Sequence, residues 1–206
     1  TLGLPRLIEI VDARRAPSTP MMEIHLSKNA KSLDFAKRIA HEIEETFLDD
    51  IADIVVDIGR MHVLVTLDEE KMKQKGLKKK QIEEALNKTK MVKSMKKKEK
   101  GGEETYVLEC DERSYKRLQK LVEAVRYHKL KGVNDIKRAL IRKIKDRYVI
   151  FTEGSNLSVI LNMDSIDSAK TTTNNIQEIL EVLGIEAARN AIIKEAYNTL
   201  REQGLI

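Results

Sequence analysis

The chain has 206 residues, 41% of them apolar, which is enough to bury the core of one medium domain or two small ones. No apolar run reaches the roughly 18 residues that span a bilayer, and the lack of Trp argues against a stacking platform for single-stranded nucleic acid. The formal net charge of +5 is unevenly distributed along the chain.

The first 110 residues predict short helices and strands in mixed order. Pro5 suits the first turn of a helix in which Leu7, Ile8 and Val11 recur at helical spacing. Ser32 is a suitable N-cap for a second helix. The elements expected here are a helix from Pro5, a strand at 24–26, a helix at 33–46, strands at 51–58 and 61–67 joined at Gly59-Arg60, helices at 69–75 and 79–88, a mobile loop at 90–102 and a strand at 105–110.

The rest of the chain predicts a helix, a pair of strands and then more helices. The strands should turn at Asp146-Arg147, and Asn175 with Glu178 three residues later forms a capping-box-like helix start. The expected elements are a helix at 113–128, strands at 136–145 and 148–152, a short helix at 156–162 and helices at 176–183 and 185–203.

Strands and helices are segregated along the chain rather than strictly alternating, so the predicted fold class is α+β. The composition changes at both ends of a lysine-rich middle part. We therefore expect a discontinuous base formed by residues 1–48 and 130–206, with residues 49–129 inserted as a separate lobe.

Positive charge is concentrated in the predicted lobe. Residues 71–100 contain 13 Lys against three Glu, a net charge of +10, so the remaining residues sum to −5. A basic lobe on a mildly acidic body suits contact with a polyanion. The same lysines also suit a solvated loop that binds nothing, and the sequence leaves both interpretations open.

The sequence predicts no catalytic or metal site and no cofactor. Its four His and single Cys are not at ligand spacing, and it has neither a glycine-rich phosphate loop nor a serine-nucleophile motif. The acidic group Asp49, Asp50 and Asp53 is expected to cap and solvate the chain before a strand. Cys110, flanked by carboxylates, is expected to be structural, and a lone cysteine fits a reducing, cytoplasmic location.

Five stretches resemble the largest subunit of the multisubunit RNA polymerases, in particular the archaeal form whose C-terminal third is a separate polypeptide. They occur in the order and spacing found in that family. The stretches are Thr1-Leu2-Gly3-Leu4-Pro5-Arg6-Leu7-Ile8-Glu9-Ile10, Gly132-Val133-Asn134-Asp135-Ile136, Glu153-Gly154-Ser155-Asn156-Leu157, Thr172-Thr173-Asn174-Asn175-Ile176 and Gly184-Ile185-Glu186-Ala187-Ala188-Arg189.

The resemblance implies a place for each part of the chain. Thr1, Leu2, Gly3, Leu4, Pro5 and Arg6 resemble the tail of the trigger loop, the mobile element that closes over the incoming nucleotide. The base would be a cleft made of helices and a small antiparallel sheet, and residues 49–129 stand where the family carries its α/β jaw lobe. Because the chain opens on Thr1 inside such a unit, we expect it to be a piece of a longer subunit.

The resemblance also implies a function. The jaw would grip downstream duplex DNA through phosphate contacts with little base readout. The candidate phosphate contacts are Arg14, Arg15, Lys78, Lys79 and Lys80, although a surface arginine paired to a carboxylate is an equal alternative for Arg15.

The family is a magnesium-dependent nucleotidyltransferase that holds its Mg²⁺ in an aspartate-rich loop absent from this sequence. We therefore expect no catalysis by this piece alone, no small-molecule substrate, no membrane contact, and other polymerase subunits as partners. The alternative is an assembly module that docks small subunits or transcription factors without touching DNA. A self-contained enzyme is the least favoured interpretation.

Overall fold

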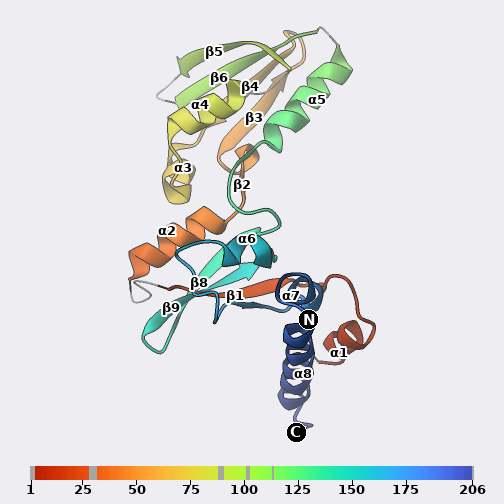
Figure 1. The fold of residues 1–206 in the computed structure, drawn as a ribbon. Helices are drawn as coiled ribbons and strands as arrows, with labels where there is room; N and C mark the ends of the chain where they lie inside the picture. The colour runs from red at the N-terminus through yellow and green to blue at the C-terminus, as the bar shows by residue number, and fades with distance from the viewer. Residues whose placement is uncertain (1–2, 28–31, 88–90, 101–102, 113, 206) are drawn as a thin grey trace. The chain divides into compact units, whose positions relative to one another are not determined.

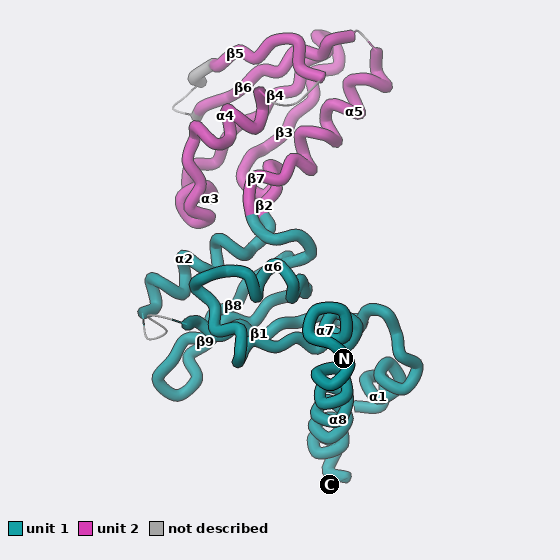
Figure 2. Tube along the Cα trace, viewed as in Figure 1, with its two compact units in different colours: residues 1–45, 132–206 teal, residues 46–131 magenta. Residues whose placement is uncertain are grey.

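The computed structural model describes residues 3–27, 32–87, 91–100, 103–112 and 114–205, and every structural statement below refers to these residues. The chain divides into two compact units (Figure 2): unit 1 comprises residues 1–45 and 132–206, and unit 2 comprises residues 46–131. The division expected from sequence sets its boundaries at residues 48 and 130. Both units combine helices with antiparallel sheets, so the predicted α+β class is confirmed.

Unit 1 is built on a four-stranded antiparallel sheet with strand order β10-β1-β9-β8 (Figure 1). Its core row crosses three strands, because Ile24 pairs with Ile150 and Ile150 pairs with Ile141. The strands are β1 (Met21–His25), β8 (Arg138–Ile144), β9 (Arg147–Glu153) and β10 (Thr172–Thr173). The helices are α1 (Leu4–Val11), α2 (Leu33–Ile43), α6 (Leu157–Leu161), α7 (Ile176–Leu183) and α8 (Ile185–Glu202).

Helix α2 packs an apolar face on this sheet. Ser32 caps its start by accepting a hydrogen bond from the backbone N–H of Phe35, as predicted. The helix ends at Ile43 rather than at the predicted residue 46, because Glu44 is already extended and Thr46 enters a strand. The apolar pattern of the sequence does not reveal this helix end, because buried residues lie on both sides of it: Ile43 before it, and Thr46 and Leu48 after it.

Two of the sequence motifs pack directly against each other in unit 1. Gly154 has φ = 107°, and a Cβ placed on it would lie 1.8 Å from the carbonyl oxygen of Asp135. The backbone N–H of Lys137 donates to the carbonyl of Glu153, and the side-chain amide of Asn156 donates to the carbonyl of Asn134. The turn at 153–156 therefore fits the 134–137 segment only when its second residue lacks a side chain.

Replacing Gly154 with Ala should destabilise unit 1 by roughly 3 kcal/mol, because a clash with backbone adds to a strained φ. For a chain of this size that corresponds to a drop of about 6–12 °C in Tm. Thermal unfolding followed by circular dichroism measures it, with Gly59→Ala as the control, since Gly59 has no positive φ and the atom nearest to a Cβ there would be 3.6 Å away. Equal melting of both variants would contradict the packing described here.

Unit 2 is a four-stranded antiparallel sheet with order β3-β4-β6-β5, covered on one face by helices. A second, two-stranded sheet pairs β2 with β7. The strands are β2 (Thr46–Phe47), β3 (Ala52–Asp57), β4 (His62–Leu67), β5 (Val92–Lys100), β6 (Glu103–Cys110) and β7 (Lys129–Lys131). The helices are a 3-10 turn η1 (Leu48–Asp50), α3 (Glu69–Lys75), α4 (Lys79–Asn87) and α5 (Tyr115–Arg126).

Most of the helices and strands predicted from local sequence patterns in unit 2 are observed. Asp68 caps α3 by accepting from the N–H groups of Glu70 and Lys71, and Gly76 ends it in the left-handed conformation with φ = 66°. The helices supply Met72, Ile82, Leu86, Leu118, Leu121 and Val125 to one core with the inner face of the sheet. The predicted hairpin at 51–67 is the β3–β4 pair.

The mobile loop predicted at 90–102 is wrong for the residues that the structure describes, because 92–100 form edge strand β5. Residue 90 and residues 101–102 lie outside the described part. The lysine run hid the strand, but its side chains still follow the strand period: Met95 and Lys97, two residues apart, lie on the same side of the sheet, where Met95 packs on the core and Lys97 contacts Glu83 and Glu104. Lysines on an edge strand also discourage unwanted strand pairing.

Candidate nucleic-acid interface

The start of α4 carries three consecutive candidate phosphate contacts, which differ in their surroundings. Lys79 lies 2.7 Å from Glu69 and 3.1 Å from Glu104, so two carboxylates already neutralise it. These hydrogen bonds raise the pKa of Lys79 and lower the pKa of Glu69. Lys79 is therefore part of the ion network inside unit 2, and its charge is the least available of the three to an outside anion.

That network also holds β5 in place. Lys97 lies 3.3 Å from Glu104 and 3.7 Å from Glu83, and the hydroxyl of Tyr106 donates to Glu83 at 2.8 Å. Burial, and then the hydrogen bond to Glu83, raises the pKa of Tyr106 well above its usual value. Two lysines and three glutamates from α3, α4, β5 and β6 thus form one ion network beside a buried tyrosine.

Lys78 and Lys80 are exposed, and neither forms an ion pair within the described ranges. The backbone N–H of Lys78 donates to the side chain of Gln81, which fixes the first turn of α4. This turn contains no acidic residue. Because a helix N-terminus carries partial positive charge, lysines there cost local stability unless an anion lies nearby. The start of α4 therefore presents two exposed positive charges beside a helix N-terminus.

Arg14 and Arg15 follow α1 in unit 1, and both are exposed. Ala13 takes the left-handed conformation with φ = 49°, and the N–H of Arg14 donates to the carbonyl of Glu9. This Schellman-type ending fixes the direction in which the chain leaves the helix. In the part of the chain that is described, neither arginine forms an ion pair.

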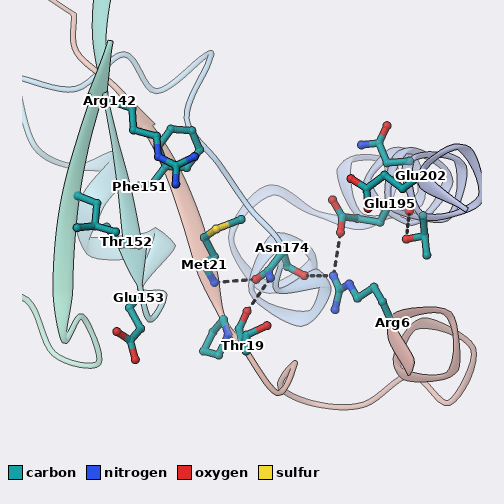
Figure 3. A pocket seen from close by; sticks show the side chains of 14 residues that line it. Arg6, Thr19, Met21, Arg142, Phe151, Thr152, Glu153, Asn174, Glu195 and Glu202 are labelled. Carbon is teal, nitrogen blue, oxygen red and sulfur yellow. Dashed lines mark hydrogen bonds and ion pairs between the residues drawn. The ribbon is translucent and has the colours of Figure 1, made fainter. Parts of the chain in front are cut away.

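Arg6, expected as part of the trigger-loop remnant, is the centre of a buried polar network (Figure 3). Its guanidinium lies 3.2 Å from Glu9 and 3.1 Å from Glu195, and it donates to the carbonyl of Asn174 at 2.6 Å. Figure 3 draws the contacts to Glu195 and Asn174. The side chain is 8% exposed. Asn174 in turn donates to the carbonyl of Thr19 and accepts from the backbone N–H of Met21. One arginine therefore joins α1, α8 and the start of β1.

Glu9 is the other buried charge of α1. It accepts hydrogen bonds from the hydroxyl and the backbone N–H of Ser18, in addition to its ion pair with Arg6. These contacts, the Ser18 hydroxyl first, lower the pKa of Glu9 from its ordinary value of 4.5 despite the opposing effect of burial. The loop from 12 to 18 is thereby folded back on α1.

A cavity of about 560 Å³ lies beside this network. Its floor is the outer face of the sheet, where Arg142 stacks over the Phe151 ring at 5.5 Å (Figure 3). Glu195 and Glu202 of α8 line the opposite side. The lining mixes charges of both signs around an aromatic ring and presents no nucleophile paired with a base.

The remaining trigger-loop candidates have simple positions. Thr1 and Leu2 lie outside the described residues. Gly3 has φ = 73° and precedes α1. A Cβ placed on it would lie 3.0 Å from Nε2 of the Gln203 side chain. Leu4 and Pro5 form the exposed first turn of α1. Sequence reasoning missed Asn174 and Glu195 as partners of Arg6, because more than 160 residues separate them from it.

The predicted capping box at α7 is half right. Asn175 caps the helix by accepting from the N–H of Gln177. Glu178, however, accepts from the Ser155 hydroxyl and from the N–H of Leu157. The carboxylate therefore ties α7 to the turn before α6, and the pattern of residue types could not show this longer-range use.

Within the described ranges, no group of three or more His, Cys, Asp or Glu is arranged to hold a metal ion. Asp50 accepts from the backbone N–H of Phe47, and Asp49 lies 3.7 Å from Arg126, which is the capping and solvating role expected for them. Cys110 is buried in the core of unit 2. Among the helices described, none is long and apolar enough to cross a membrane.

These features define a protein of two α+β units, one organised by a buried arginine and the other rich in lysine. The family described as RNA polymerase Rpb1, domain 5, matches residues 1–206. The DNA-directed RNA polymerase subunits Rpo1C of Thermococcus gammatolerans and of Methanocaldococcus jannaschii are 43% and 45% identical to the whole chain over 207 residues. The chain belongs to this family, which confirms the resemblance in its sequence. It spans 52% and 24% of the length of these two relatives.

Ionised Glu9 should stabilise unit 1 fully above pH 4.5, because its folded-state pKa is depressed, and this contribution should disappear as the pH falls through that lower pKa. Glu9→Gln is expected to melt below the unmodified chain at pH 7, with the gap narrowing below about pH 4.5. Thermal unfolding from pH 7 to pH 3.5 measures the gap. Exposed Glu181→Gln is the control and should change Tm little at pH 7. A pH-independent gap for Glu9→Gln would refute this role.

Proposed function

We propose that the chain acts within a DNA-directed RNA polymerase, where unit 2 forms part of the jaw and contacts the phosphates of downstream duplex DNA. The observation that carries this proposal is the start of α4, where Lys78 and Lys80 are exposed and unneutralised while Lys79 is held by Glu69 and Glu104. The surrounding net charge of +10 over residues 71–100 favours the approach of a polyanion.

In this proposal the contact is electrostatic and reads no sequence. Phosphates carry no base information, and lysines bind them as point charges. Arg15 is a second phosphate candidate in unit 1, since it is exposed at a fixed helix end. Arg14, by contrast, lines an apolar groove of unit 1.

Unit 1 would brace the trigger loop from its base. The support for this is the anchoring of α1, a short helix whose only fully buried residues are Arg6 and Glu9. A mobile loop that closes on a nucleotide needs a fixed point at which its motion ends. The catalytic Mg²⁺ would be held by another part of the polymerase, the chain would need no cofactor or small-molecule substrate of its own, and it would act in the cytoplasm beside the other subunits.

Changing Lys78 and Lys80 together to Gln should weaken binding to a short DNA duplex. The decrease of log K with log salt should also become less steep, by about 0.9 for each phosphate that is no longer neutralised. Fluorescence anisotropy over a salt series measures this slope. Lys79→Gln is the matched control. Lys79 is already paired with Glu69 and Glu104, so its removal should leave the slope nearly unchanged.

Three outcomes of this titration separate the two functional hypotheses. Steep, sequence-independent weakening of binding with salt, reduced in the double variant alone, supports DNA gripping. Unaltered binding in the double variant removes α4 from the interface. No binding even at low salt contradicts DNA contact and favours an assembly module, since an interface with an apolar core responds much less to salt.

A further inference from the structure

Helices α1, α7 and α8 come together in unit 1 (Figure 1). They line an apolar groove of about 290 Å³. Helix α8 lines it with Ile185, Ile192 and Ile193, which are 68%, 40% and 56% exposed. Helix α7 adds Leu180, and Ile10 comes from α1. Single exposed aliphatic residues are ordinary, but several that line one groove mark an interaction site.

The packing of α8 explains why these side chains remain uncovered. Of its 18 residues, only Ala188 and Thr199 are buried. The helix thus buries only small side chains fully and leaves its three isoleucines exposed. An 18-residue helix gains most of its stability from a covered apolar face, so α8 as described is incompletely packed.

The available charge at the groove is positive. Arg14 and Arg189 both line it. Arg14 forms no ion pair among the described residues, and Arg189 makes only a long contact of 3.7 Å to Glu186, with both side chains at least 69% exposed. Such exposed pairs contribute little. The one carboxylate in the lining, Glu9, is already engaged by Ser18 and Arg6.

We propose that this groove binds an amphipathic helix from another polypeptide of the same polymerase. Its apolar residues, spaced i, i+3/i+4, i+7, would meet the isoleucines of α8, and its Asp or Glu residues would meet Arg14 and Arg189. Arg14 then serves a protein interface rather than DNA. The proposal rests on membership of a polymerase and is independent of DNA contact by unit 2.

Site-specific photo-crosslinking in the reconstituted polymerase tests this surface. A benzophenone amino acid replaces Ile193 in the groove, and a second variant places it at Val159 on α6, which is 45% exposed and does not line the groove. Mass spectrometry identifies the attached peptide. We expect Ile193 to crosslink to one segment with apolar residues at helical spacing and flanking Asp or Glu, and Val159 not to reach that segment.

Charge reversal tests the rim in the same assay. Arg14→Glu with Arg189→Glu should reduce the Ile193 crosslink by about fivefold, since each reversed pair changes from attraction to repulsion. Lys143→Glu with Arg147→Glu is the charge-matched control, because both residues are exposed on the β8–β9 hairpin and do not line the groove. Crosslinking to DNA, to a second copy of this chain or to no polypeptide would overturn the proposal, as would equal effects of the two reversals.

Discussion

A buried guanidinium organises unit 1. Arg6 faces inward from α1 and is shared by Glu9, Glu195 and the carbonyl of Asn174. Taking this charge out of water is costly unless every partner is present, so α1, α8 and the 174 segment must assemble together. The same constraint sets which face of α1 is buried. Its buried residues are the charged Arg6 and Glu9, while Leu4 and Val11 are 67% and 81% exposed. The exposed apolar surface is thus a consequence of the ionic anchor.

The lysines of unit 2 fall into two groups, those that form ion pairs within the unit and those that do not. Lys79 and Lys97 form ion pairs with Glu69, Glu83 and Glu104 at the surface of unit 2, and these pairs tie the helices to edge strand β5. Lys78 and Lys80, by contrast, are exposed and form no ion pair among the described residues. Net charge counts paired and unpaired lysines alike, so only the structure separates the two groups.

The two units therefore suggest different kinds of partner. The groove of unit 1 is apolar with a basic rim, which suits a protein helix, whereas the start of α4 in unit 2 is polar and basic, which suits a phosphate backbone. The two hypotheses formed from the sequence, DNA gripping and subunit docking, can both apply to this chain, each to its own surface.

Sequence patterns predicted features that depend on neighbouring residues. The caps at Ser32 and Asp68, the end of α3 at Gly76 and the β3–β4 hairpin all follow from local chemistry. Strand β5 was missed because lysines interrupt its apolar alternation, and the partners of Lys97 come from α4 and β6. The Arg6 network was missed because its partners lie far along the chain, and residue type alone does not distinguish a buried arginine from an exposed one.

The proposed DNA contact requires the start of α4 to lie on downstream DNA in the working polymerase. A photo-crosslinker at Lys80, with one at exposed Val55 on β3 as the reference, would test this in a polymerase assembled on a duplex template. We expect Lys80 to crosslink to duplex DNA ahead of the active site and Val55 to do so much less. Crosslinking of Lys80 to protein alone, or equal DNA crosslinking from both positions, would contradict DNA contact at α4.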